Sequence, residues 1–139
     1  MWNGVRSTSP AETRAAGMQF VTQLPPGTVA ALHGELGSGK TTFVRGMAAG
    51  LGLTDQVSSP TFELIHEYGS PVGLYHIDCF REQALERWQS LGLQEYFDGD
   101  ARTVVEWAEL ILPLLPKDTI HLQFTHGSRD SERWIEVRP

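Results

Sequence analysis

A glycine-rich segment of the chain has the residues needed to bind phosphate. Residues 34–41 read Gly-Glu-Leu-Gly-Ser-Gly-Lys-Thr, which matches the spacing G-x-x-x-x-G-K-[ST]. The Lys40 ammonium would face β and γ phosphates, the Thr41 hydroxyl would hold Mg²⁺, and the Thr42 hydroxyl would reach an α-phosphate oxygen. Glycine lets backbone amides approach phosphate oxygens, and the loop residues expected to lie there are Gly34, Gly37, Ser38 and Gly39. The segment therefore predicts a phosphate-binding loop, or P-loop.

Two carboxylates stand at the ends of predicted strands and could complete a magnesium site. Asp78 ends the largely apolar run 73–78, and Glu106 ends the run 102–106. Ligands of open α/β sheets bind at the carboxyl edge, so both side chains are expected near the P-loop as metal-binding and catalytic groups. The alternative is that each is a solvated acid at a strand end, or the cap of the next helix.

Thr61 lies between the P-loop and these carboxylates, in the segment 58–62 (Ser-Ser-Pro-Thr-Phe). A loop threonine downstream of a P-loop can sense the γ-phosphate and Mg²⁺, as switch segments do. The alternative is an ordinary proline turn that leads into a strand, and the residues alone leave both interpretations open.

The elements that flank the loop fit this interpretation. The apolar run 28–33 is typical of a strand covered on both faces. A helix is predicted from Lys40, with Phe43, Val44 and Met47 at helical spacing, ending near Gly50. An earlier helix is predicted over 10–24, because Ser-Pro-Ala-Glu at 9–12 forms a capping box.

The rest of the chain reads as further strands and short helices. Strands 61–68 and 73–77 are predicted to form a hairpin, after a loop at 58–60. The remaining predictions are helix 82–91, strand 102–106, a short helix 108–112 and a closing hairpin of strands 120–125 and 133–137. Together they predict a three-layer α/β, P-loop NTPase-like domain with a mixed central sheet, and a single domain over 1–139. The pattern leaves the strand order open.

Composition narrows the class of protein further. The 139 residues carry a formal net charge of −6, which argues against a broad basic face for nucleic acid. The single cysteine, Cys79, allows no internal disulfide and no cysteine-rich metal site, and the five histidines lack metal-ligand spacing. No run is long enough to cross a membrane, so a cytoplasmic location is expected.

The motifs taken together resemble the TsaE (YjeE) family, the P-loop ATPases of bacterial tRNA threonylcarbamoyladenosine synthesis. The resemblance rests on the P-loop at 34–43, Val-Ser-Ser-Pro-Thr-Phe at 57–62, Tyr-His-Ile-Asp-Cys-Phe-Arg at 75–81 and Val-Glu-Trp-Ala-Glu at 105–109. It departs from the usual pattern at Cys79-Phe80, where the family has Leu-Tyr, and at Ala108, where it has Pro.

The resemblance implies a function and a set of roles. The protein would bind ATP and Mg²⁺, hydrolyse ATP slowly by itself, and sustain turnover of the TsaD–TsaB complex, meeting tRNA only through these partners. The metal would be bound by Thr41, Asp78 and Glu106. Catalysis would involve Glu106, Asp78 and a switch-like Thr61. The resemblance places the segment Ser9 to Thr13 near the base, and lets Trp107 flank the nucleotide.

Several alternatives remain beside this interpretation. A small-molecule P-loop kinase is the main one, although little chain follows Glu106 to build a lid. A GTP switch normally needs Asn-Lys-x-Asp, which surrounds neither Lys40 nor Lys117. A binding module with a degenerate loop conflicts with the intact Lys40 and Thr41. His76 is interpreted as a structural residue beside Asp78, and Trp107 as either a core aromatic or a base contact.

Overall fold

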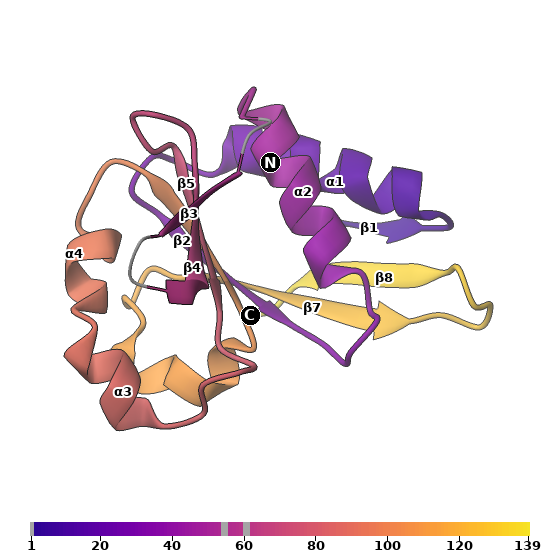
Figure 1. Ribbon diagram of the computed structural model, residues 1–139. Helices are drawn as coiled ribbons and strands as arrows, with labels where there is room; N and C mark the ends of the chain where they lie inside the picture. The colour runs from indigo at the N-terminus through magenta and orange to yellow at the C-terminus, as the bar shows by residue number, and fades with distance from the viewer. Residues whose placement is uncertain (1, 54–55, 60–61) are drawn as a thin grey trace.

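The computed structural model describes residues 2–53, 56–59 and 62–139 (Figure 1). In these residues the strands form one eight-stranded mixed sheet with the order β1-β8-β7-β2-β6-β5-β4-β3. The strands are β1 (Gly4–Ser7), β2 (Val29–His33), β3 (Gln56–Ser59), β4 (Phe62–Tyr68), β5 (Leu74–Asp78), β6 (Arg102–Glu106), β7 (Ile120–His126) and β8 (Arg133–Val137).

The centre of the sheet is parallel and its margins are antiparallel. Strand β2 pairs in parallel with β6 and β7, and β6 pairs in parallel with β5. In this register Glu106 lies beside Leu32 on one side and Asp78 on the other. The carboxyl ends of β2, β5 and β6 therefore meet at one edge, as ligand sites of open α/β sheets require.

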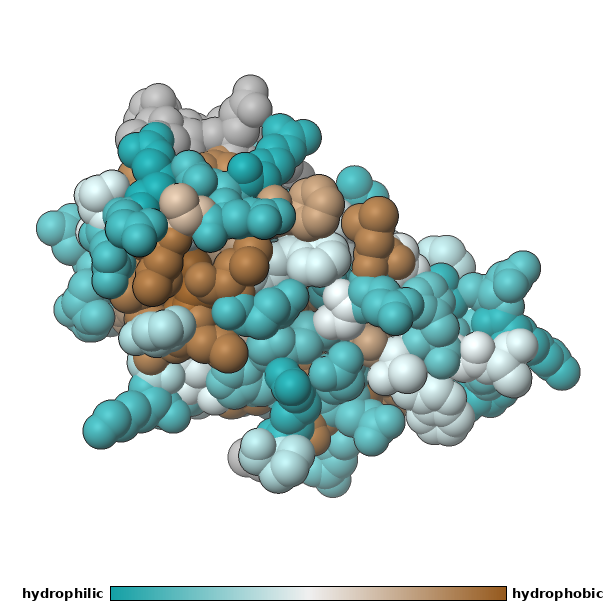
Figure 2. Space-filling model, turned by 90° about the horizontal axis from the view of Figure 1, so that it is seen from below, coloured by the Kyte–Doolittle hydropathy of each residue, from teal (hydrophilic) through white to brown (hydrophobic). Residues whose placement is uncertain are grey.

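Helices cover both faces of the sheet, so the predicted three-layer α/β architecture with a mixed sheet is confirmed. One layer holds α1 (Pro10–Gln23) and α2 (Lys40–Gly50), and the other holds α3 (Leu85–Ser90), α4 (Leu93–Phe97) and the 3₁₀ helix η1 (Ala108–Leu114) (Figure 1). Each face has its own core, one around Phe20 and Phe43 and the other around Trp88. Apolar side chains also reach the surface on the second layer (Figure 2), where Leu112 of η1 is 47% exposed.

The start of α1 follows its predicted capping signal. The Ser9 hydroxyl accepts a hydrogen bond from the Glu12 backbone N–H at 3.1 Å, and Pro10 occupies the first turn. The Glu12 carboxylate accepts from the backbone N–H and the hydroxyl of Thr8, both at 2.8 Å, which lowers the pKa of Glu12. These bonds satisfy free donors at the helix start and anchor the segment that leads to the site.

The structure also corrects parts of the sequence interpretation. Ser58 and Ser59, predicted as loop, belong to β3, and the helix predicted over 82–91 covers only 85–90 and is followed by α4. The edge strand β1 was not predicted. It pairs only with β8, near the other end of the chain, so no local pattern marks it.

Helices α1 and α2 pack closely because glycines face the opposing backbone. A Cβ built on Gly17 would lie 2.1 Å from the Phe43 carbonyl oxygen, and one on Gly46 would lie 1.9 Å from the Arg14 carbonyl oxygen. Both distances are much shorter than a van der Waals contact, and the atoms contacted are backbone atoms, which cannot move aside as the end of a flexible side chain could. Helix α2, which starts at the P-loop, is thus held in place by close backbone contact with α1.

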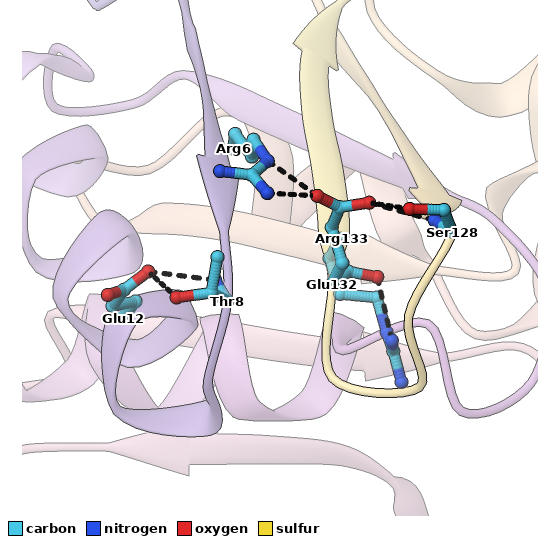
Figure 3. A network of polar contacts seen from close by, with 6 residues as sticks. All are labelled: Arg6, Thr8, Glu12, Ser128, Glu132 and Arg133. Carbon is cyan, nitrogen blue, oxygen red and sulfur yellow. Dashed lines mark hydrogen bonds and ion pairs between the residues drawn. The ribbon is translucent and has the colours of Figure 1, made fainter.

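The turn between β7 and β8 is held by the carboxylate of Glu132 (Figure 3). Glu132 is buried, pairs with the Arg6 guanidinium of β1, and accepts from the Ser128 backbone N–H at 2.8 Å. Its own carbonyl accepts from the Gly127 N–H at 2.9 Å. These contacts close the hairpin and connect it to β1, which sets the position of the residues that follow the turn.

Gly17→Ala is predicted to destabilise the protein by about 1–3 kcal/mol, because the added methyl group must push two backbones apart. Alanine is normally favoured over glycine inside a helix, so a decrease in the free energy of unfolding would itself indicate the close contact between α1 and α2. Urea unfolding measures the change. Gln19→Ala, on the exposed side of α1, is the control and should stay within about 0.5 kcal/mol of the parent. Stabilisation by Gly17→Ala would contradict the observed helix contact.

Glu132→Gln should lower the unfolding temperature at pH 7 and lose most of this effect in acid. The Ser128 backbone N–H, and then Arg6, hold the pKa of Glu132 below its ordinary value of 4.5. A depressed pKa stabilises the fold above the unfolded-state pKa, and this contribution disappears as pH falls through the folded-state pKa. Thermal unfolding at pH 7 and pH 3 tests the effect. The control is Glu136→Gln on the exposed side of β8, and an equal loss at both pH values would rule out the ionised network.

Candidate nucleotide-binding site

A cavity of about 540 Å³ opens at the carboxyl edge of the central strands, above the start of α2. Most of the residues predicted for the site line it: Ser9, Thr13, Gly37, Gly39, Lys40, Thr41, Thr42, Asp78, Glu106 and Trp107. Gly34 lines an adjacent cavity instead, Ser38 is fully buried within the loop, and Thr61 lies outside the described residues. The fold therefore gathers residues from distant parts of the chain around one opening.

The P-loop has the backbone form that its glycines permit. Gly37 and Gly39 have φ values of 77° and 100°, in the left-handed region that side chains rarely adopt. Gly39 is the N-cap of α2 and offers no side-chain cap, so the first-turn N–H groups of the helix lack that partner. Free amides and the positive end of the helix dipole favour an anion at this point.

Lys40 places a cation inside this opening. Its side chain is 5% exposed, and its ammonium donates to the Gly34 carbonyl and lies 3.8 Å from the centre of the Trp107 ring. Burial lowers the pKa of Lys40, while Glu106, Glu109 and Asp78 act in the opposite direction. An ammonium has three N–H donors and this contact uses one, so donors remain for phosphate oxygens.

Glu106 is a buried carboxylate in contact with the P-loop helix. It is 3% exposed, and the Thr41 hydroxyl lies 3.2 Å from each of its two oxygens. The Nε2 atom of His76 lies 2.5 Å from Oε2 of Glu106. Asp78 is half-buried, and its carboxylate accepts from the Phe80 backbone N–H at 3.0 Å. His76, interpreted from the sequence as a hydrogen-bonded structural residue beside Asp78, makes its hydrogen bond to Glu106.

Trp107 turns toward the cavity because β6 ends one residue earlier. Its φ of 58° and ψ of 40° are left-handed, which is unusual for a residue other than glycine. Strand alternation would have pointed Trp107 away from Glu106, whereas this turn brings both to the same opening. The ring packs against Phe80 at 4.9 Å between centres. Both interpretations left open by the sequence have a counterpart in the structure, because the ring lines the cavity and also packs against the core around Trp88.

The amino-terminal candidates reach the cavity from the start of α1. Ser9 lines it from the N-cap position, and Thr13 is 3% exposed with its hydroxyl 2.7 Å from that of Ser7. The Thr13 side chain also lies within 4 Å of where a Cβ on Gly39 would be. Helix α1 therefore forms a wall of the cavity next to the P-loop.

Arg133 is a cavity residue that the sequence interpretation missed. It donates to the Gly37 carbonyl at 3.1 Å and to the Asp130 carbonyl. Asp130 and Ser131, in the turn closed by Glu132, line the cavity with it. Residues 126–133 contain no recognisable motif. One indirect signal was available: β7 runs parallel to β2, so it ends at the same edge of the sheet as the P-loop, and the turn that leads into β8 must lie at that edge.

The donors present fit a magnesium–nucleotide ligand. The Ser38 hydroxyl is buried in the P-loop and has no hydrogen-bond partner among the described residues. Lys40 and the start of α2, described above, line the cavity. Among residues 2–53, 56–59 and 62–139, no group of three or more His, Cys, Asp or Glu could hold a metal ion. Mg²⁺ does not need one, because it binds through one or two protein oxygens, phosphates and water. Thr41 and Glu106 offer such oxygens.

Comparison with known proteins agrees with this arrangement. Residues 7–135 match the family model described as threonylcarbamoyl adenosine biosynthesis protein TsaE. A tRNA threonylcarbamoyladenosine biosynthesis protein TsaE from Bacillus subtilis is 43% identical over 131 residues, covering 94% of this chain and 81% of the relative. The protein of the same name from Treponema pallidum is 39% identical, with 82% of this chain and 84% of the relative covered.

A solved structure gives the same result for the fold. The crystal structure of Bacillus subtilis YdiB superposes with a TM-score of 0.78 at 38% sequence identity, covering 96% of this chain and 82% of that one. No helix in the described part of the chain is long and apolar enough to cross a membrane. The match of the family model over nearly the full length, together with these relatives, shows that this chain belongs to the TsaE family.

Proposed function

We propose that this protein is a Mg²⁺-dependent ATPase of tRNA threonylcarbamoyladenosine biosynthesis that works with the TsaD–TsaB complex. The place in tRNA modification follows from its family and from the names of its relatives. The ATPase activity is supported by the P-loop and the carboxylate beside it. The whole of residues 1–139 acts as one P-loop domain in the cytoplasm, and the net charge of −6 favours contact with tRNA through partners.

One observation carries the proposal: Thr41 and Glu106, 65 residues apart in sequence, meet through their side chains beside Lys40. The P-loop amides and Lys40 would bind the phosphates of ATP, and Thr42 would add a hydroxyl donor. Thr41 and Glu106 would hold Mg²⁺, which neutralises charge on the phosphates, with Asp78 as a further acid at the site. Glu106 would also orient the attacking water. Ser9 and Thr13 lie on the cavity wall where the base would bind. Thr61 would act as the switch residue.

The surface around the cavity supports action with a protein partner. Leu36 of the P-loop is 75% exposed and Phe80 is 46% exposed, and both line the cavity. Exposed apolar side chains beside a site are typical of protein interaction surfaces. A partner seated there would close the site over the phosphates, and we expect hydrolysis to be slow in the isolated protein and faster in the complex.

The proposal is tested by measuring phosphate release from ATP and Mg²⁺ with and without purified TsaD–TsaB. We expect slow release alone and clear stimulation by the partners. Transfer of phosphate to a small metabolite without partners would instead identify a kinase. No stimulation, with ATP bound, would refute the accessory ATPase.

Lys40→Ala should weaken ATP binding about 10- to 100-fold, because it removes a buried charge-assisted donor worth about 1.5–3 kcal/mol. Isothermal titration calorimetry with ATP and Mg²⁺ measures the affinity. Lys117→Ala is the matched control, because Lys117 is the only other lysine and is exposed. Equal affinities for Lys40→Ala and the parent protein would remove Lys40 from the binding site.

Glu106→Ala should lower the turnover number about 100-fold or more, with a smaller change in nucleotide affinity, if its carboxylate acts mainly in the transition state. Steady-state phosphate release in the presence of the partners, together with nucleotide titration, separates the two effects. Glu95→Ala on the exposed side of α4 is the control. Turnover that survives Glu106→Ala would transfer the proposed role to Asp78.

A further inference from the structure

His76 occupies a position that phosphate binding does not explain. It lies on β5 and is 7% exposed. Alternation along the strand places it on the same face as Leu74, whose side chain belongs to the core beneath α1 and α2. A buried imidazole in such a layer is costly unless it is hydrogen-bonded. Its Nε2 atom lies at hydrogen-bond distance, 2.5 Å, from Oε2 of Glu106.

The chemistry of this contact assigns the proton. An ionised carboxylate only accepts hydrogen bonds, so the imidazole must donate from Nε2. Glu106 receives a second donor, the Thr41 hydroxyl, which lies 3.2 Å from each carboxylate oxygen. One donor comes from β5 within the sheet and the other from the first turn of α2.

These two donors act differently on the carboxylate. The threonine hydroxyl is shared evenly between the oxygens, so it does not select one of them. The imidazole binds Oε2 alone, from a strand whose register beside β6 is set by backbone pairing of Asp78 with Glu106. His76 therefore determines the rotation of the carboxylate, because among the described residues it is the donor that distinguishes Oε2 from Oε1.

We propose that His76 is a positioning residue that orients Glu106, so that the imidazole holds Oε2 and Oε1 is turned toward the reaction. This inference rests on the proposed ATPase function for its kinetic consequence. Partners that orient a metal-binding or catalytic side chain commonly change metal affinity or activity about 10- to 100-fold when removed. His76 acts through Glu106 and need not touch ATP.

The kinetic test compares two variants of His76 in the full-length protein with TsaD–TsaB. His76→Leu keeps an apolar volume and removes the donor, whereas His76→Gln keeps an N–H donor near the position of Nε2. We expect the turnover number to fall about 10- to 100-fold in His76→Leu, with ATP affinity measured without Mg²⁺ unchanged, and to recover substantially in His76→Gln. Tyr75→Phe is the control, because Tyr75 is on the same strand and its ring contacts Tyr96 in the opposite layer.

A second measurement does not depend on ATP. Nitrogen-15 NMR of the protein without nucleotide should show a proton on Nε2 of His76, with a resonance that shifts in Glu106→Gln. A proton on Nδ1 alone would overturn the hydrogen-bond assignment even if the protein proves to be an ATPase. If wild-type protein hydrolyses no ATP, the proposed function fails, and the NMR result still decides whether His76 orients Glu106.

The kinetic outcomes are equally decisive for the inference. A folded His76→Leu variant with turnover within twofold of wild type would overturn it. So would loss of ATP affinity with unchanged turnover, because that would place His76 in binding. A His76→Gln variant as impaired as His76→Leu would show that imidazole packing, and not the donated hydrogen bond, is what matters.

Discussion

The buried carboxylate of Glu106 is the constraint on which the site depends. It lies at the end of a central strand, under the first turn of α2, where an unpaired charge would strongly oppose folding. Its cost is offset by donors from two directions, Thr41 and His76. The same contacts connect the helix that begins at the P-loop to the sheet. A group that has to be satisfied for the fold to be stable is thereby placed beside the P-loop.

Close packing around this carboxylate determines how the P-loop is presented. Helix α2 is held against α1 by direct backbone approach at Gly17 and Gly46. Because Ser9 is the N-cap of α1, the same helix that packs against α2 also supplies a wall of the cavity. Lys40 rests between the Gly34 carbonyl and the Trp107 ring, so its charge is compensated inside the protein. The packing of the protein itself therefore holds the P-loop and Lys40 in place, with the remaining donors of Lys40 facing the opening.

The carboxyl-terminal hairpin completes the cavity from the opposite side. The Glu132 network with Arg6 and Ser128 closes its turn, and Arg133 then reaches the Gly37 carbonyl (Figure 3). Strand β1 contributes Arg6 to this network, so the two ends of the chain support one wall together. The apolar side chains of Leu36 and Phe80 at the mouth remain exposed beside it.

Local sequence determined the P-loop, the helices that flank it and the strands that end in Asp78 and Glu106, because glycine geometry, capping and hydrophobic periodicity are short-range properties. Tertiary structure alone decided which atoms meet. The imidazole of His76 contacts Glu106 and not Asp78, since side-chain partners depend on strand pairing across the sheet. Trp107 faces the cavity through a left-handed turn that alternation could not anticipate. Strand β1 and Arg133 were invisible to sequence analysis because their roles arise from contacts between segments more than 90 residues apart.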